Sequence, residues 1–406
     1  MKSKSVEQIG KYQVDVDDYK FRDVEQMNLA HEEARKKYNR MSSCLFLQKL
    51  IAAFGCTKRG IDNSSESARC YKKMPTPPSL CNLPDVVARN IFNKVGFKSI
   101  QNLRKVCHDL RNRIDDIKPE PHLSVVVIEV NDCDITMTYE LIESPYIVEY
   151  EKTVESGQSI IRHYRQEKIV HGDFMELALR DLLLILKFQK KKMDSICFFN
   201  ATKNSNHFLQ VLETLTSFLA LENRLLKVDE VIVNASDQKT VITALSLIDP
   251  QSIGGIVLLD KNFDFDWERK VLPKITHMEH WESLTSFKCK FVINCVSTHD
   301  FRHFSWVEFI FRSITTEYLL EWKKIFENSS ENGSFSIQYE MFEGREQLFE
   351  KMGPSVRTRN GDFEWYFRMS TTADYVMQIR LNDSLKLIYF SNYRMTHIPE
   401  HAVIRK

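Results

Sequence analysis

Short runs of β-branched and aromatic residues return at intervals along residues 195–341, and helical segments separate them. The runs between 195 and 293 begin roughly 22 to 33 residues apart, which leaves room for one strand and one helix in each interval. The predicted strands are 195–199, 228–233, 254–259, 287–293 and 335–341. The predicted helices in and around this region are 174–191, 206–221, 238–248, 318–326 and 345–351. This alternation predicts an α/β fold.

The spacing of these units is close to that of leucine-rich-repeat-like solenoids, in which each unit buries its open face against the next. The repeat is irregular and lacks the Leu-x-x-Leu-x-Leu signature, so a doubly wound α/β sheet is the alternative. Three further predicted strands, 363–369, 375–381 and 385–390, are joined by short polar turns. We expect them to pair antiparallel and to cap the open end of the solenoid.

Composition divides the chain into four segments. The first is polar and helix-prone, and we expect it to form an extension and linker. Pro75, Pro77 and Pro78 mark the end of that linker, because proline lacks a backbone donor and fixes φ. A β-branched run at 123–130 marks a later change from helix to strand. The predicted segments are the extension at 1–74, a helical module at 75–118, a connecting β/α segment at 119–194, and the α/β domain at 195–395.

The helical module contains two short amphipathic helices. Pro84 suits the first turn of a helix, where the N–H groups have no intrahelical partner. Gly96 is placed to end the first helix, and Ser99 is placed to cap the second. The apolar positions at helical spacing are Val87, Ile91, Phe92 and Val95 in the first helix and Leu103, Val106, Cys107, Leu110 and Ile114 in the second. Two such helices expose more apolar surface than they bury against each other, which predicts a module that docks on another protein.

This module resembles the F-box, a small helical domain that docks on an SKP-family adaptor of cullin-RING ubiquitin ligases. The dipeptides Leu83-Pro84, Ile91-Phe92 and Val106-Cys107 carry the resemblance. An ordinary helical hairpin with a cysteine in its core is the alternative. The adaptor-binding residues that the resemblance implies are Leu83, Pro84, Val87, Ile91, Phe92, Val95, Leu103, Val106, Cys107 and Leu110.

A second resemblance covers the α/β region. It is carried by Val228-Asp229-Glu230-Val231, Met278-Glu279-His280-Trp281, Thr315-Thr316-Glu317-Tyr318-Leu319 and Trp365-Tyr366-Phe367-Arg368-Met369, together with the connecting block 104–112. These segments look like the FTH domain of the large nematode F-box family and follow the F-box in that family's order. The resemblance implies a substrate receptor of a ubiquitin ligase, whose C-terminal domain holds an unidentified target protein near the ubiquitin-conjugating enzyme. It implies no catalytic residue, cofactor or metal.

Charge and hydropathy restrict the partners further. The chain of 406 residues has 56 Lys and Arg against 55 Asp and Glu, a formal net charge of +1, so no global field attracts nucleic acid or an anionic membrane. No apolar run approaches the roughly 20 residues of a membrane helix, and the first residues are charged where a secretory signal is apolar. Nine cysteines without a CxxC pair predict reduced thiols. We therefore expect an intracellular protein of the cytoplasm, the nucleus or both.

Two groups of side chains offer a different chemistry. His277, His280, His299 and His303 lie near one another in the sequence, and histidines at helical spacing chelate zinc, but no HExxH pattern is present. Asp173, in His171-Gly172-Asp173, is placed as in the catalytic loop of small-molecule phosphotransferases. The other parts of that site are missing, so a turn with Asp173 at a helix start is favoured. The alternatives to a receptor are an α/β enzyme, of the transferase kind, and a scaffold that binds the adaptor without ubiquitylation.

One further stretch combines unusually many aromatic residues: Phe301, Phe304, Trp306, Phe309 and Phe311. Packing in a core is the favoured interpretation, because aromatic side chains bury large areas. Aromatic residues are also enriched at protein interfaces, so part of this stretch is a candidate contact for a partner.

Overall fold

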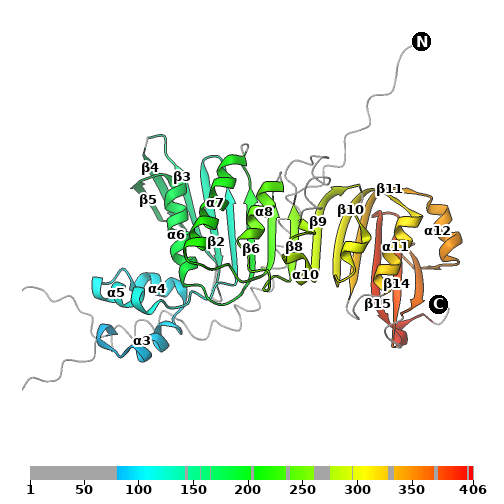
Figure 1. Ribbon diagram of the computed structural model, residues 1–406, viewed down its shortest axis with the longest axis horizontal. Helices are drawn as coiled ribbons and strands as arrows, with labels where there is room; N and C mark the ends of the chain where they lie inside the picture. The colour runs from blue at the N-terminus through cyan, green and yellow to red at the C-terminus, as the bar shows by residue number, and fades with distance from the viewer. Residues whose placement is uncertain are drawn as a thin grey trace, which may run out of the picture. The chain divides into compact units, whose positions relative to one another are not determined.

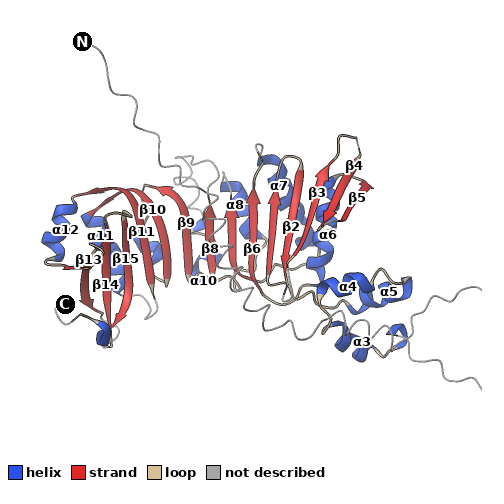
Figure 2. Ribbon diagram, turned by 180° about the vertical axis from the view of Figure 1, so that it is seen from behind, coloured by secondary structure: helices blue, strands red, loops and turns tan. Residues whose placement is uncertain are grey.

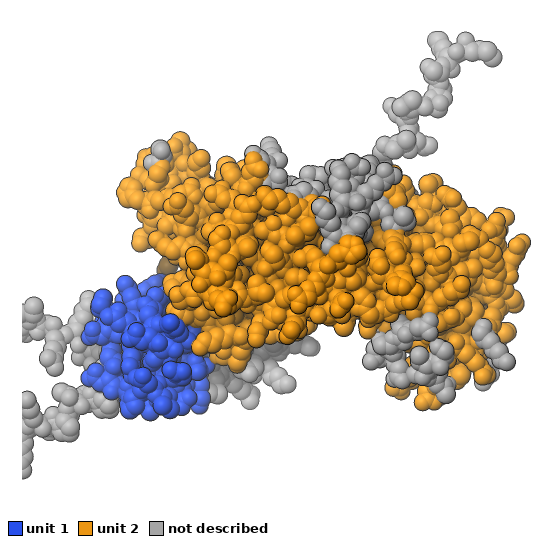
Figure 3. All heavy atoms as spheres, viewed as in Figure 1, with its two compact units in different colours: residues 1–119 blue, residues 120–406 orange. Residues whose placement is uncertain are grey.

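The structure is a computed structural model that describes residues 80–141, 145–155, 157–164, 166–202, 205–234, 238–259, 275–294, 296–327, 333–369, 374–399 and 402–405. The chain divides into two compact units, residues 1–119 and residues 120–406, shown in Figure 3. The extension predicted at 1–74 lies outside the described residues.

The described part of the first unit is a 3-10 turn followed by three short helices. These are η1 (Leu80–Asn82), α3 (Asp85–Phe92), α4 (Phe97–Leu103) and α5 (His108–Ile117). One apolar core joins them, formed by Leu80, Ala88, Phe92, Val95, Ile100, Leu103, Leu110, Ile114 and Ile117. Each helix contributes a few side chains to this core, so none of the three buries its apolar face alone.

The helix boundaries predicted for this unit were wrong in three places. Gly96 is the N-cap of α4 and does not end α3, whose C-cap is Asn93. Ser99 lies inside α4 instead of capping a helix. The second predicted helix is two helices, because Cys107 adopts an extended conformation and caps the start of α5.

The second unit is built on one sheet of sixteen strands. The order is β12-β13-β14-β15-β11-β10-β9-β8-β7-β6-β1-β2-β3-β4-β5, and β16 pairs with β13. The strands are β1 (Val125–Val130), β2 (Asp134–Glu140), β3 (Tyr146–Lys152), β4 (Gln158–His163), β5 (Gln166–His171), β6 (Met193–Asn200), β7 (Val228–Asn234), β8 (Gly255–Leu259), β9 (Ser286–Ile293), β10 (Trp306–Thr315), β11 (Ser334–Glu343), β12 (Val356–Arg357), β13 (Phe363–Arg368), β14 (Tyr375–Asn382), β15 (Leu387–Arg394) and β16 (Ile404–Arg405).

The middle of this sheet is parallel and its two ends are antiparallel. Strand β1 and strands β6 to β11 each pair in parallel with the next one of the series. Along the chain, each new strand of this series is added on the same side of the previous one. The reversal of strand order that defines a doubly wound sheet is therefore missing among the described strands. Strands β1 to β5 form an antiparallel meander at one end, and β13, β14 and β15 pair antiparallel with one another beside β11 at the other.

The helices of this unit lie along one face of the sheet (Figures 1 and 2). They are α6 (Phe174–Phe188), α7 (Ser205–Leu221), α8 (Gln238–Ser246), α10 (His280–Ser283) and α11 (Thr316–Glu327), with α12 (Arg345–Met352) packed beside α11. Figure 2 shows the other face, which no described helix of the unit crosses. The strand residues beneath the helices are buried and alternate with partly exposed ones, as the two-residue period of a strand requires.

The aromatic stretch forms much of the core between the sheet and α11. Phe301 packs against Trp281 and Phe309 with ring centroids 5.2 Å and 5.0 Å apart, and Phe309 lies 5.6 Å from Trp322. All four rings are buried. The core packing favoured from the sequence therefore holds for Phe301, Phe304, Phe309 and Phe311, while Trp306 is exposed.

The predicted strands and helices of the α/β region all occur in the structure, with shifted ends. Four strands of the antiparallel meander, strand β10 and the two-residue strands β12 and β16 were not predicted. In β2 the buried residues alternate with polar ones on the open face, and in β5 nearly every residue is exposed, so neither segment is strongly apolar. The stretch at 119–194, predicted as a connecting β/α segment, contributes β1 to β5 to the same sheet and α6 to the helices on its face.

Candidate protein-docking site

The three helices of the first unit leave several apolar side chains exposed to solvent. Val86 and Val87 on α3 are 71% and 43% exposed, and Val106, in the turn between α4 and α5, is 51% exposed. A valine that moves from water into an apolar contact contributes about 1.5–3 kcal/mol. These three valines are therefore the strongest apolar contacts that the described part of this unit offers to another protein.

The start of α3 is fixed by α5. Pro84 stands immediately before the helix, in an extended conformation, and its backbone carbonyl accepts the first helical hydrogen bond from Ala88. The Arg113 guanidinium donates a hydrogen bond of 2.6 Å to the backbone carbonyl of Leu83 and forms an ion pair of 2.7 Å with Asp85. The two exposed valines of α3 are thus presented by a helix whose first turn is held from the neighbouring helix.

The start of α5 is held by Cys107. Its Sγ accepts a hydrogen bond from the backbone N–H of Leu110 at 3.4 Å, so it takes the place that serine or threonine usually occupies at an N-cap. The preceding turn is tied to α5 by an ion pair of 2.9 Å between Arg104 and Asp115. This arrangement leaves Val106 and Cys107 exposed at the corner between the two helices.

The ten residues that the sequence assigned to docking fall into three groups. Phe92, Val95, Leu103 and Leu110 are buried in the core of the unit. Leu83 and Ile91 are partly buried against that core. Pro84, Val87, Val106 and Cys107 are exposed. In the described conformation, only the last group and the accessible parts of the second can touch another protein directly.

Val86 was missed from the sequence. It lies one position outside the stripe formed by Val87, Ile91 and Val95, so the helical period gave it no weight. Two consecutive valines in the first turn of a short helix could have indicated it, because adjacent residues cannot both face the core and at least one is then exposed.

The side chains that suggested an enzyme have structural partners. The Asp173 carboxylate is the N-cap of α6 and accepts hydrogen bonds from the backbone N–H groups of Met175 and Glu176 at 2.9 Å and 3.2 Å. The predicted turn at a helix start is therefore confirmed. Gly172 before it has a φ of 131°, a conformation that residues with a Cβ rarely adopt.

The four histidines do not come together as a ligand set in the structure. Nε2 of His280 lies 3.0 Å from the backbone oxygen of Ile248, and Nε2 of His303 lies 2.9 Å from that of Trp281. Among the residues that the structure describes, no group of three or more His, Cys, Asp or Glu is arranged to hold a metal ion.

Comparison with family models identifies both parts of the chain. A model of the F-box domain matches residues 80–121, and a model of the FTH domain matches residues 209–349. The chain combines an F-box with an FTH domain. The F-box covers η1 and helices α3 to α5, and the FTH domain covers the parallel strands β7 to β11 with their helices. Searches of curated proteins and of solved structures found no match.

The F-box match supports a general role for this part of the chain. F-box proteins generally act in ubiquitin ligase complexes and in protein–protein interaction, and the F-box supports a role here as the adaptor-binding subunit of such a ligase. None of the described helices is long and apolar enough to cross a membrane.

Proposed function

We propose that this chain is the substrate-recognition subunit of an SKP–cullin–F-box ubiquitin ligase. The F-box binds an SKP-family adaptor, the adaptor joins it to a cullin-RING ligase, and the second unit holds a target protein. The observation that carries the first half is the F-box match over three helices that leave Val86, Val87 and Val106 exposed. The chain acts by proximity, because a tethered target lysine meets the charged ubiquitin-conjugating enzyme at a high effective concentration.

We propose that the target binds on the face of the sheet that the helices leave uncovered. Two exposed aromatic residues support this location, namely Trp306 on β10, 45% exposed, and Tyr389 on β15, 40% exposed. Both neighbour the same strand: Trp306 pairs with Ser334 of β11 and Tyr389 with Ser336. Since residues two apart on a strand share a face, both aromatic side chains belong to one face. Exposed aromatic residues are the commonest anchors of protein interfaces.

The order of the parallel strands also supports this proposal. Strands β6 to β11 are each adjacent to the next in sequence, with helices on one face. We infer from this order an irregular leucine-rich-repeat-like solenoid. The antiparallel strands β13 to β15 act as the cap at one end. In such folds the strand face remains available to a partner.

The alternative of an α/β enzyme depended on Asp173 and on the histidine cluster, and side chains of both groups have structural partners. The Asp173 carboxylate is used as a helix cap, and His280 and His303 each lie at hydrogen-bond distance from a backbone carbonyl. A scaffold that binds the adaptor without ubiquitylation makes the same adaptor contact as a receptor. Reconstituted ubiquitin transfer to a bound protein distinguishes the two, because only the receptor supports it.

The experiment that tests the proposal is titration of the purified full chain with an SKP-family adaptor. The variant carries Val86→Asp with Val87→Asp, and Val154→Asp in the second unit is the matched control because Val154 is fully exposed there. The exposed fractions of Val86 and Val87, 71% and 43%, together amount to about one fully exposed valine, whose burial corresponds to at least about a tenfold change in affinity. We expect at least that loss in the double variant and none in the control, with unchanged thermal unfolding in both. Equal affinity of all three proteins, or no binding by the folded wild type, overturns the proposal.

A further inference from the structure

Among the described strands, β5 forms an unpaired and well-formed edge at one end of the sheet. Strand β5 pairs with β4 on one side and is the last strand of the order at that end (Figure 2). All its residues except Val170 are exposed. The opposite end of the order is β12, which is only two residues long. A long edge strand offers unpaired N–H and C=O groups to another strand, and short edges are one way in which proteins prevent such pairing.

The backbone hydrogen bonds decide which groups of β5 point outward. The Gly172 N–H donates a hydrogen bond of 2.9 Å to the carbonyl of Gly157, just beyond the ends of β4 and β5. The carbonyl of Gln158 accepts a hydrogen bond from the Thr153 N–H, so the backbone groups of Gln158 point toward β3 and away from β5. In an antiparallel pair, hydrogen-bonded and non-hydrogen-bonded residue pairs alternate. Gln166, Lys168 and Val170 accordingly bond to β4, and the residues whose backbone groups point away from the sheet are Glu167, Ile169 and His171.

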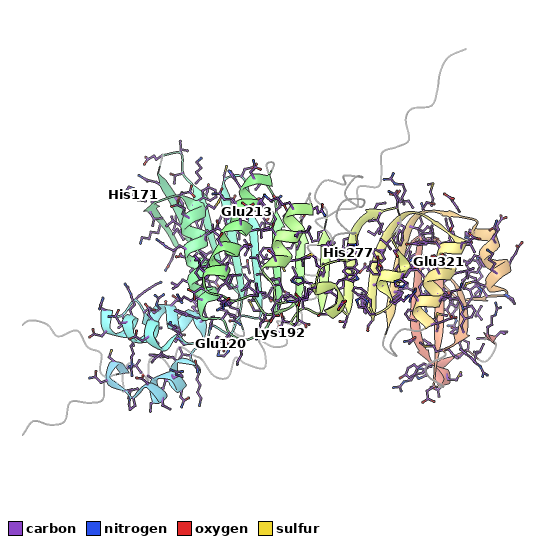
Figure 4. The ribbon with its side chains drawn as sticks, viewed as in Figure 1. Glu120, His171, Lys192, Glu213, His277 and Glu321 are labelled. Carbon is purple, nitrogen blue, oxygen red and sulfur yellow. The ribbon has the colours of Figure 1, made fainter. Side chains whose placement is uncertain are left out.

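The side chains of these three residues share one face of the sheet, because they lie two apart along the strand. On that face Ile169 pairs with Ile160 of β4, and the Glu167 carboxylate is 3.1 Å from the Arg162 guanidinium. Ile169 is 60% exposed despite this neighbour. Figure 4 shows His171 at this end of the sheet. The strand has no proline, and its one lysine, Lys168, belongs to the opposite face, so its outward edge carries neither of the residues that usually block pairing.

We propose that β5 pairs antiparallel with β5 of a second copy of this chain, with the two Ile169 residues opposite each other. This register places Glu167 of each copy directly opposite His171 of the other. All three outward-pointing residues then form hydrogen-bonded pairs, and each pair exchanges two backbone bonds. The edge is therefore complementary to itself in both backbone and side chains.

The side-chain rows across the joined sheets support this register. The middle row runs Ile160, Ile169, Ile169 and Ile160 over four strands, and it is apolar throughout. The row on each side of it continues from Arg162 to Glu167 and on to His171 of the second copy. Opposite charges or apolar side chains that face each other across strands each contribute roughly 0.2–1 kcal/mol.

The two neighbouring registers are less favourable. A shift that centres the pair on Lys168 places the two Lys168 ammonium groups opposite each other, and like charges in that position are destabilising. A shift that centres it on Val170 leaves Glu167 without a backbone partner on the second copy. Charge and overlap thus select the register centred on Ile169.

The contact is short, so we expect a reversible dimer with a roughly micromolar dissociation constant. It involves no residue of the F-box and does not depend on the proposed function. If that function also holds, the dimer presents two F-boxes and two target faces, which increases the avidity for a target with repeated sites.

Sedimentation velocity of the full chain over a concentration series tests the pairing. The variants are Ile169→Lys, which places two ammonium groups opposite each other, and Ile169→Pro, which removes an outward N–H that β4 does not use. Each variant is expected to weaken association at least about tenfold. A wild type that remains monomeric at roughly 100 μM, or a dimer that both variants leave intact, overturns the proposal.

A charge exchange tests the register itself. His171→Glu places two carboxylates opposite each other in the homodimer, and Glu167→Lys removes the carboxylate that faces His171, so both variants are expected to associate less than the wild type. In an equimolar mixture of the two variants, the introduced lysine of one copy faces the introduced glutamate of the other, and the unchanged His171 faces the unchanged Glu167. The introduced pair then has opposite charges and the other pair is that of the wild type, so the mixture is expected to form the heterodimer. A mixture that associates no better than its components overturns the proposed pairing.

Discussion

Arg113 on α5 donates a hydrogen bond of 2.6 Å to the backbone carbonyl of Leu83, the residue that precedes Pro84 at the start of α3. The same guanidinium forms an ion pair with Asp85 in the first turn of α3. One side chain thus fixes the position of the turn that carries Val86 and Val87. The valines are exposed, whereas the residue that presents them is partly buried.

Arg113→Ala is expected to loosen the first turn of α3. A hydrogen bond that involves a charged group contributes about 1.5–3 kcal/mol, and the exposure of Asp85 places this contact at the lower end of that range. Hydrogen exchange at the amides of α3 measures the change, with Arg89→Ala as a control on the exposed side of the same helix. Equal exchange in both variants would show that Arg113 does not hold α3.

The cysteines are expected to differ sharply in reactivity. Cys107 is exposed at the start of α5, whereas Cys197 on β6 is buried, and burial raises the pKa of its thiol to about 12. Because the thiolate is the reactive form, Cys197 should remain unmodified by iodoacetamide at neutral pH while Cys107 reacts. Mass spectrometry of the alkylated native chain checks this, and modification of Cys197 before Cys107 would contradict the burial.

Cys107 also has a structural role that substitution reveals. Cys107→Ala removes the N-cap of α5 and is expected to cost about 0.5–2 kcal/mol, whereas Cys107→Ser retains an acceptor at the same place. Denaturant unfolding of the two variants measures the difference in the free energy of unfolding. If serine destabilises the chain as much as alanine does, the hydrogen bond to Leu110 is not what the cysteine supplies.

Asp173 should behave as a cap. Asp173→Ala is expected to lower the free energy of unfolding by about 0.5–2 kcal/mol, and Asp173→Asn should retain most of it because asparagine also caps helices. Thermal unfolding of both variants provides the measurement. An asparagine variant as unstable as the alanine variant would show that the negative charge, and not the cap, is required.

The second unit should lose stability in alkali. Burial, helped by Asp181, raises the pKa values of Tyr139 and Tyr150 well above the ordinary value of 10.0, and the Tyr150 hydroxyl donates a hydrogen bond of 2.9 Å to Asp181. Above pH 10 the unfolded chain therefore loses protons that the folded chain keeps, so the free energy of unfolding falls as pH rises through and beyond 10. Below pH 10 both states keep these protons, and no such slope is expected.

Urea unfolding at several pH values measures this slope. Tyr150→Phe should reduce it, because this substitution removes one of the phenol groups whose pKa is raised by burial. An unaltered slope in Tyr150→Phe would contradict the assignment to this residue.

Hydrophobic periodicity was sufficient to predict most of the α/β unit. In β7 buried and more exposed residues alternate, and β8 is buried along most of its length, so both strands are recognisable from the sequence. It failed for the meander, where β5 is exposed along almost its whole length and is held by pairing with β4. Cross-strand pairing is not visible in the sequence of one strand, so such edge strands give little local signal.

For the docking residues, helical spacing could not separate buried side chains from exposed ones. Helical spacing identified Phe92, Leu110 and Val87 as equivalent apolar positions, but the first two are buried and Val87 is exposed. The spacing reports which side chains share a stripe and not whether the stripe faces the core or a partner. In a unit of three short helices, core and docking surface are parts of the same apolar stripes, and only the packing separates them.

We expect the F-box to bind the adaptor and the second unit to bind the target independently of each other. Quantitative affinity purification from cells that express the chain tests it most directly, with the wild type, the Val86→Asp and Val87→Asp variant, and a Trp306→Ala and Tyr389→Ala variant. We expect the first variant to lose the adaptor and cullin and to keep other bound proteins. The second variant should keep the adaptor and cullin and lose at least one of those proteins. Retention of the adaptor by the first variant, or loss of the same proteins from both, would contradict it.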